Sequence, residues 1–273
     1  MILIPMLSLF AFSFTPVKVG FQNFRFIGLN NYKSLLQDAD FLASFGTTLV
    51  LLAGTVFCQM FLGIVFALVI NKTKFLTGFV RLIMMFPMVV SPIIVGIIWR
   101  TLIMPSFGGF DLALTSLGLP GFPDMLSSPW KARLLIIVAA TWEWTPFVIL
   151  YILAGLEGLS AAPFESAKID GVNWFQEVFY LTLPMLSKII LVVLIFRIIE
   201  CMKVFPLIFS LTLGGPGTAT QDLTYLVYQS GFRYLKLGYA STVSMFILLL
   251  AVVAIVIMGL TTRQKKYKNE VNR

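Results

Sequence analysis

Three charged residues stand within one otherwise apolar run, where charge requires a function or a partner. Arg197, Glu200 and Lys203 are spaced i, i+3 and i+6, so on a helix the first two could pair, as could the last two. A charge near a bilayer centre costs about 2.5–3.5 kcal/mol, so these side chains should face protein or a watery cavity. Either they form a structural ion-pair network between helices, or they line a translocation path.

Glu143 poses the same question in a second apolar run, because Trp142 and Trp144 flank it. Polar groups beside aromatic rings suit the binding of a sugar. We therefore place Trp142, Glu143 and Trp144 with the three charges above as candidate residues of a translocation path, and keep the structural interpretation beside it.

The sequence lacks the residues that enzymatic catalysis, metal binding and ATP hydrolysis would require. The chain has no histidine, which excludes Ser-His and Cys-His nucleophiles and HExxH zinc sites. Cys58 and Cys201 lie far apart in apolar segments, which favours buried thiols over a disulfide or a metal pair. A GxxxxGK[ST] motif is also missing, so ATP would have to be hydrolysed by another chain. We expect no catalytic residue, metal site or cofactor in this chain.

The elements that position these residues should be membrane helices. The 273 residues are 59% hydrophobic and 12% charged, about half the charge of a soluble domain. Runs long enough to cross a bilayer occur at 47–70, 82–99 (despite Pro87 and Pro92), 134–154, 189–213 and 239–262. The sequence therefore predicts a single all-α domain over 1–273, a polytopic transmembrane bundle of about six spans.

The two ends of the chain bear on the sixth span and on orientation. MILIPMLSLFAFSFTP is apolar but too short to cross alone, and we interpret it as half of a first span whose beginning is short or missing. The basic tail RQKKYKNEVNR predicts a cytoplasmic C-terminus by the positive-inside rule. The net charge of +8 is spread along the chain without a single patch, so we expect a lipid bilayer and no nucleic acid as partner.

A polar interruption, FESAKIDGVNWFQEVFYLTLP, covers 164–184 within a loop of about 155–185. Pro163 suits a first helical turn, Glu165 suits its positive end, and Asp170-Gly171 predicts a turn. Phe175, Val178 and Phe179 would share one face of a second helix that Pro184 ends. From the residues alone this is a helix-turn-helix on the cytoplasmic side, which an ordinary interfacial loop could also be.

The spacing of this stretch resembles the EAA loop of ABC-importer permeases, E-A-A, three residues, G, nine residues, I-x-L-P. Here Glu165, Ser166 and Ala167 precede Gly171 by the same interval, and Leu181-Thr182-Leu183-Pro184 follows. The departures are Ser166 for alanine and Leu181 for isoleucine. FIGLNNY at 26–32, WTPFVILYILAGL at 144–156 and the run from LGGPGTATQDL to LGYAS at 213–241 are similar to the carbohydrate branch, which includes maltose and glycerol-3-phosphate permeases.

The resemblance implies a role and a set of partners. The chain would be a permease subunit in a prokaryotic cytoplasmic membrane, importing a sugar or polyol. It would pair with a second permease (a heterodimer), two ATPase subunits that hold ATP and Mg²⁺, and an extracytoplasmic solute-binding protein. The residues that would couple to the ATPase are Glu165, Ser166, Ala167, Asp170, Gly171, Leu183 and Pro184.

The Gly- and Thr-rich loop 211–223 is a turn by composition alone. In the family it approaches the solute-binding protein, so the resemblance implies that contact for Gly214, Gly215, Pro216 and Thr220. Competing functions are an amino-acid or peptide ABC importer, an ion-coupled secondary transporter, and an intramembrane enzyme. The last two leave the match at 164–184 unexplained.

Overall fold

The computed structural model describes residues 3–18, 25–73 and 78–271, and within these the regular elements are all helical. The prediction of an all-α fold is confirmed. In chain order the elements are α1 (Leu3–Ser13), α2 (Asn30–Gln37), α3 (Ala39–Thr73), α4 (Gly78–Val89), α5 (Pro92–Leu102), α6 (Gly109–Ser116), α7 (Pro129–Glu157), α8 (Ala162–Ile169), α9 (Trp174–Gln176), the π-helix η1 (Glu177–Thr182), α10 (Leu183–Cys201), α11 (Phe205–Leu211), α12 (Leu223–Tyr228), the π-helix η2 (Gln229–Arg233) and α13 (Leu237–Val271).

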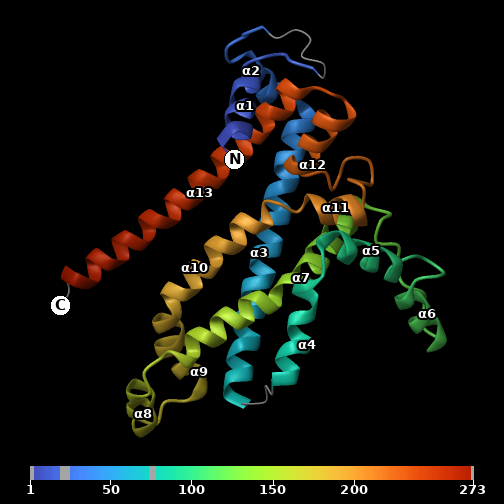
Figure 1. Cartoon of the computed structure of the whole chain (residues 1–273). Helices are drawn as coiled ribbons and strands as arrows, with labels where there is room; N and C mark the ends of the chain where they lie inside the picture. The colour runs from blue at the N-terminus through green and yellow to red at the C-terminus, as the bar shows by residue number, and fades with distance from the viewer. Residues whose placement is uncertain (1–2, 19–24, 74–77, 272–273) are drawn as a thin grey trace.

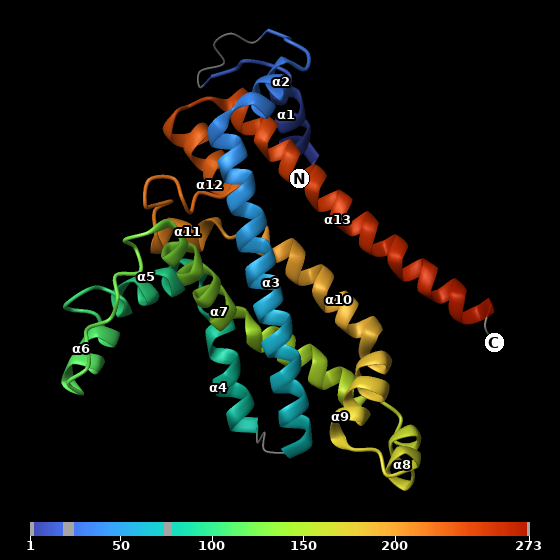
Figure 2. The ribbon, with the colours of Figure 1, turned by 180° about the vertical axis from the view of Figure 1, so that it is seen from behind.

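The long helices α3 and α7 pack along each other and form the centre of the bundle (Figure 1). α10 packs against both of them, and α4 packs on α7. α13 contacts α1 and α12 near its start and then diverges from the bundle, so its C-terminal end lies apart from the other helices (Figures 1 and 2). α8 lies at the far end of α7 and α10, away from α1 and α2 (Figure 2).

Four helices of the described chain are long and apolar enough to cross a membrane: Ala39–Lys72, Pro129–Glu157, Trp174–Cys201 and Leu237–Val256. A fifth is obtained if Ile83–Val89 and Pro92–Leu102 are taken as one broken span. α1 is apolar but only 11 residues long, which agrees with the expectation that this segment is too short to cross alone.

The predicted span at 82–99 is sharply broken at Pro92. α4 and α5 meet at 107°, because Ser91 has an extended backbone and Pro92 starts a new helix. The residue before a proline is driven from helical to extended conformations, and the proline itself supplies no N–H. Pro87, in contrast, is accommodated inside α4.

The predicted span at 189–213 is wrong in its bounds. α10 ends at Cys201, and α11 starts at Phe205 with Pro206 in its first turn. The apolar helix instead extends backwards through η1 to Trp174. The break after Cys201 leaves Lys203 outside any helix.

Candidate functional site

A small cavity of about 70 Å³ lies where α3, α7 and α10 converge with the chain that enters α11. Two charged groups, Glu143 and Arg197, line its interior, and each is at most 2% exposed. The structure therefore brings together two of the charges that sequence analysis singled out from separate apolar runs. The cavity is lined by residues of these elements that include Thr55, Gln59, Ala140, Glu143, Trp144, Arg197, Glu200, Cys201 and Lys203.

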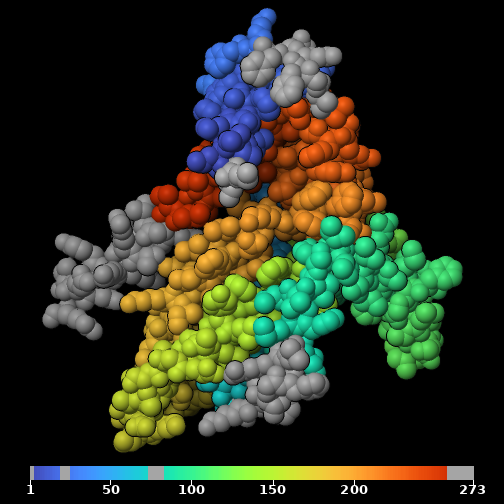
Figure 3. All heavy atoms as spheres, viewed as in Figure 1, coloured from blue at the N-terminus to red at the C-terminus, as the bar shows by residue number. Residues whose placement is uncertain are grey.

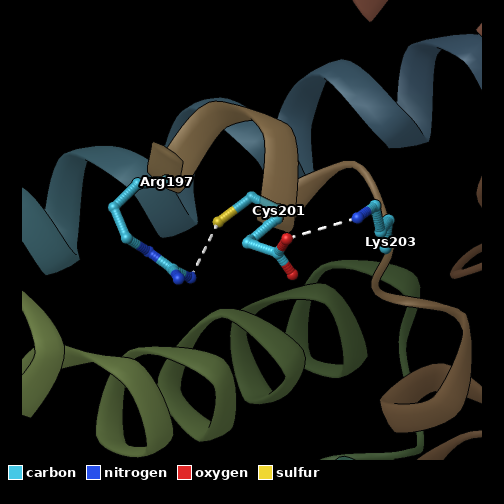
Figure 4. A network of polar contacts seen from close by, with 4 residues as sticks. Arg197, Cys201 and Lys203 are labelled. Carbon is cyan, nitrogen blue, oxygen red and sulfur yellow. Dashed lines mark hydrogen bonds and ion pairs between the residues drawn. The ribbon is translucent and has the colours of Figure 1, made fainter. Parts of the chain in front are cut away.

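Arg197 ties the three helices together through hydrogen bonds. Its Nε donates to Gln59 Oε1 at 2.8 Å, and Gln59 Nε2 donates to the Ala140 carbonyl at 2.8 Å. Its Nη2 donates to Cys201 Sγ at 3.5 Å, as Figure 4 shows. Sequence reasoning missed Gln59, for which the one available signal was an amide inside the uncharged run 47–70.

The Arg197 guanidinium also lies over aromatic rings of α7. Its Cζ is 4.7 Å from the ring centroid of Trp144 and 5.7 Å from that of Phe147. At these distances the ring face attracts the cation. Trp142 lies elsewhere: it packs edge-on against Trp99, with 6.2 Å between centroids, and does not line this cavity.

Three buried polar atoms at the cavity have no hydrogen-bond partner among the described residues: Glu143 Oε1, Arg197 Nη1 and Thr55 Oγ1. Leaving a buried polar group unsatisfied costs about 1–3 kcal/mol, and more for a charged group. Native structures normally satisfy such groups with protein or solvent. All three atoms are buried, so they lie within the packing around the cavity and are not exposed to its interior.

Glu200 and Lys203 form the ion pair at the outer part of this cavity, with Nζ 3.2 Å from Oε1. Of the two pairings the spacing allowed, this is the one formed, because the guanidinium of Arg197 is engaged by Gln59 and Cys201. The side chains of Lys203 and Glu200 are 65% and 45% exposed, so the pair contributes at most about 1 kcal/mol.

The 164–184 stretch folds as a short helix, a turn and a second helix. Pro163 lies in the first turn of α8, with Glu165 beside it, as expected. Gly171 has a φ of +74°, and a Cβ placed there would meet nothing within 4 Å. The predicted turn at Asp170-Gly171 is confirmed, and in the space-filling view this region protrudes at one end of the molecule (Figure 3).

The second helix does not end at Pro184, and that prediction is wrong. Asn173 opens α9 with a capping box to Gln176, and the chain then continues without a break into α10. Residues Glu177–Thr182 form a π-helix, and the N–H of Leu183 reaches the carbonyl of Val178. This wider turn accommodates Pro184, which cannot donate to the preceding turn and would crowd its carbonyl.

The surface of this segment is strongly exposed and apolar. Val178 is buried, but Phe175 and Phe179, expected on the same face, are 65% and 63% exposed. Ile169 at the end of α8 is 88% exposed. Between α8 and η1 lies an open groove of about 650 Å³, whose lining includes Ser166, Ala167, Asp170 and Gly171. Leu183 and Pro184 lie beyond this groove, at the start of α10.

The loop between α11 and α12 is held by its own hydrogen bonds. Thr220 is fully buried: its hydroxyl lies 2.8 Å from that of Thr212 and donates to the Gly215 carbonyl at 2.8 Å. Gly214 is buried and has a φ of +84°, and a Cβ there would lie 2.9 Å from the ring of Tyr225. Both the backbone conformation and the close ring therefore favour glycine at this position. Of the residues proposed for a protein contact, Gly215 and Pro216 are half-buried, and Thr220 instead shapes the loop.

The same loop is fixed to the long helices. Arg133 Nε donates to the Ala219 carbonyl at 2.7 Å, and its Nη2 donates to Thr47 Oγ1 at 3.1 Å. Asp222 caps α12 by accepting from the Tyr225 N–H at 2.7 Å. Burial raises the pKa of Asp222 to about 6, although its hydrogen bonds oppose the shift.

Comparison with known proteins assigns the family. The chain belongs to the binding-protein-dependent transport system inner membrane components, whose profile matches residues 59–266. It is 39% identical over 219 residues to the probable ABC transporter permease protein y4oQ of Sinorhizobium fredii, covering 80% of this chain and 70% of the relative. It is 35% identical over 213 residues to the trehalose/maltose transport system permease protein MalF of Thermococcus litoralis, covering 78% and 70%.

The fold is shared with a solved transporter. A crystal structure of a bacterial ABC transporter involved in the import of the acidic polysaccharide alginate superposes with a TM-score of 0.82. The sequences are 24% identical, and the match covers 96% of this chain and 89% of that one. The resemblance to ABC-importer permeases inferred from 164–184 is therefore confirmed.

Proposed function

We propose that this chain is one of two membrane subunits of an ATP-driven importer for a sugar or related polyol. The observation that carries the proposal is the buried cluster of Glu143, Arg197 and Trp144 beside the cavity, which places charged and aromatic groups inside the membrane-spanning bundle. Sugars are recognised by such mixtures of polar groups and ring faces. The trehalose/maltose permease among the similar proteins supports the same class of cargo.

The segment from α8 to η1 would be the contact with a partner ATPase. Its groove and its exposed Ile169, Phe175 and Phe179 offer an apolar docking surface at one end of the bundle. Glu165, Ser166, Ala167, Asp170 and Gly171 shape this groove or the turn beside it. Leu183 and Pro184 would join it to the spans. In this arrangement the segment transmits motion, and ATP and Mg²⁺ are held by the partner.

The remaining assignments follow from the same architecture. The α8 end and the basic C-terminus would be cytoplasmic, in a prokaryotic inner membrane. The loop tip at 214–220 would face the solute-binding protein, with Thr220 holding its shape. The broken pair α4–α5 would complete one span, and α1 would contribute part of a sixth. A second, similar permease would make the other half of the path, in a heterodimer.

The test is transport by the native complex, purified through a tag on this chain and reconstituted in liposomes with its binding protein. We expect uptake of a radiolabelled neutral sugar that requires both internal ATP and the binding protein. Mass spectrometry of solute co-purifying with the binding protein would identify the cargo. Uptake driven by an ion gradient without ATP would refute the proposal.

A further inference from the structure

The loop between α11 and α12 has a fixed shape and turns an uncharged surface outward. Its backbone closes on itself, because the Thr220 N–H donates to the Gly214 carbonyl at 3.1 Å. Residues 211–221 carry no charge. The exposed residues of this stretch are Leu213, Gly217 and Thr218. The loop is therefore ordered before any partner arrives, and a partner would meet an apolar and hydroxyl-bearing tip.

A stripe of hydroxyl groups on α3 forms a seat for this loop. Ser44, Thr47 and Thr48 are spaced i, i+3 and i+4, so they share one face of the helix, and each is at most 6% exposed. Gln221 Nε2 donates to Ser44 Oγ at 3.2 Å, and the Leu223 N–H donates to Thr48 Oγ1 at 2.9 Å. The loop then leads into α12, which packs on α3 (Figure 2). These bonds fix the position of the loop on the first of the two central helices.

Arg133 completes the seat from α7, the second central helix. Its Nε donates to the Ala219 carbonyl at 2.7 Å, and its Nη2 donates to Thr47 Oγ1 at 3.1 Å. The Thr47 hydroxyl donates to the same Ala219 carbonyl at 3.4 Å. One guanidinium thus joins the loop, α3 and α7, and hydrogen bonds from a charged donor are stronger than neutral ones. The planar fork of arginine can hold both acceptors at once, whereas the ammonium of lysine lacks that geometry.

We propose that Arg133 is a positioning residue for docking of the solute-binding protein, because it holds the exposed tip of the loop in the orientation that this protein engages. The inference rests on the proposed contact between the loop and the binding protein, and adds the residue that sets the geometry of that contact. A tip ordered in advance loses little conformational freedom on docking, so its seating acts on affinity. Arg133 lines neither the cavity at Arg197 nor the groove between α8 and η1, so turnover after docking does not depend on it.

The first test titrates the binding protein, as purified, against the complete permease–ATPase complex in liposomes and reads ATP hydrolysis. Arg133→Ala should raise the concentration for half-maximal stimulation at least about tenfold, with less than about a twofold change in maximal rate. Arg133→Lys should lie between Arg133→Ala and the wild type. Lys131→Ala is the matched control, because it removes the same charge from an exposed position in the first turn of α7. It should leave the half-maximal concentration unchanged.

The second test follows the loop itself in the complex without the binding protein. Hydrogen exchange read by mass spectrometry should be at least about tenfold faster over 212–223 in Arg133→Ala than in the wild type, because the seat opens more often. Lys131→Ala should exchange as the wild type does.

Several results would overturn the inference: unchanged exchange in Arg133→Ala, an unchanged half-maximal concentration, a loss confined to the maximal rate, or an equal rise in Lys131→Ala. If Arg133→Ala does not assemble, Thr47→Val, which removes the acceptor of Nη2, is judged by the same criteria with an expected rise of about threefold. Uptake that still requires ATP and the binding protein beside such a result leaves the proposed function standing.

Discussion

Replacing Gly171 tests whether the turn after α8 controls docking of the ATPase. The residue has a φ of +74°, and a Cβ there would meet nothing within 4 Å, so an alanine suffers backbone strain without a steric clash. The left-handed conformation costs a non-glycine residue about 1–2 kcal/mol. If the docked state requires this turn, Gly171→Ala should lower its population about 5- to 30-fold.

The assay titrates purified ATPase subunit against the permease in liposomes and reads binding-protein-stimulated ATP hydrolysis. Gly171→Ala should require about 5- to 30-fold more ATPase for half-maximal activity. Gly171→Asn should lie closer to the wild type, because asparagine tolerates the left-handed region. Gly158→Ala is the control, since Gly158 ends α7 with a φ of −86° and has room for a Cβ.

Two results would refute this reasoning. If Gly171→Ala docks the ATPase as the wild type does, the turn is not needed in the docked state. If alanine and asparagine weaken docking equally, the loss does not arise from backbone conformation, and a different property of glycine would have to explain it.

Three further predictions concern the bundle. Arg197→Ala should abolish most uptake while the complex still co-purifies, because it removes the bond to Gln59; normal uptake would refute a role in the path. Gly63→Ala should destabilise the bundle by about 1–3 kcal/mol and so lower its melting midpoint, because a Cβ there would lie 2.5 Å from Val148. Gly46→Ala, where a Cβ would meet nothing within 4 Å, is the control, and equal midpoints for the two variants would refute the close packing. The pKa of Asp222 is raised from 3.8 to about 6, so the protonated carboxyl stabilises the fold fully below pH 3.8, and this stabilisation is lost as pH rises through 6. In thermal melts, the fall in midpoint between pH 5 and pH 7 should therefore be smaller for Asp222→Asn than for the wild type.

The features that could be predicted from the sequence are local. Apolar runs with at most one charge identified α3, α7 and α13, because hydropathy depends only on composition within one window. The turn at Gly171 followed from the conformational freedom of glycine after a short helix. Glu143 and Arg197 were marked by the cost of charge in an apolar run, wherever their partners lay.

The features that could not be predicted depend on direction or on distant partners. Hydropathy treats 82–99 as one run and does not register the 107° change of direction at Pro92. The hydrogen-bond partner of Arg197, Gln59, is 138 residues away, so a local spacing rule could offer only Glu200. The tolerance of Pro184 depends on a π-helical turn that no residue pattern announced.

The continuity of the helix from Trp174 to Cys201 has a mechanical consequence. The chain runs from Trp174 to Arg197 as one helix, with a π-helical stretch at Glu177–Thr182 and no loop. No loop intervenes to absorb displacement, so the helix can act as a lever arm with α8 and α9 at one end and the cavity's guanidinium near the other. A tilt of the end that carries α8 and α9 would be transmitted to Arg197 and would strain its hydrogen bond to Gln59.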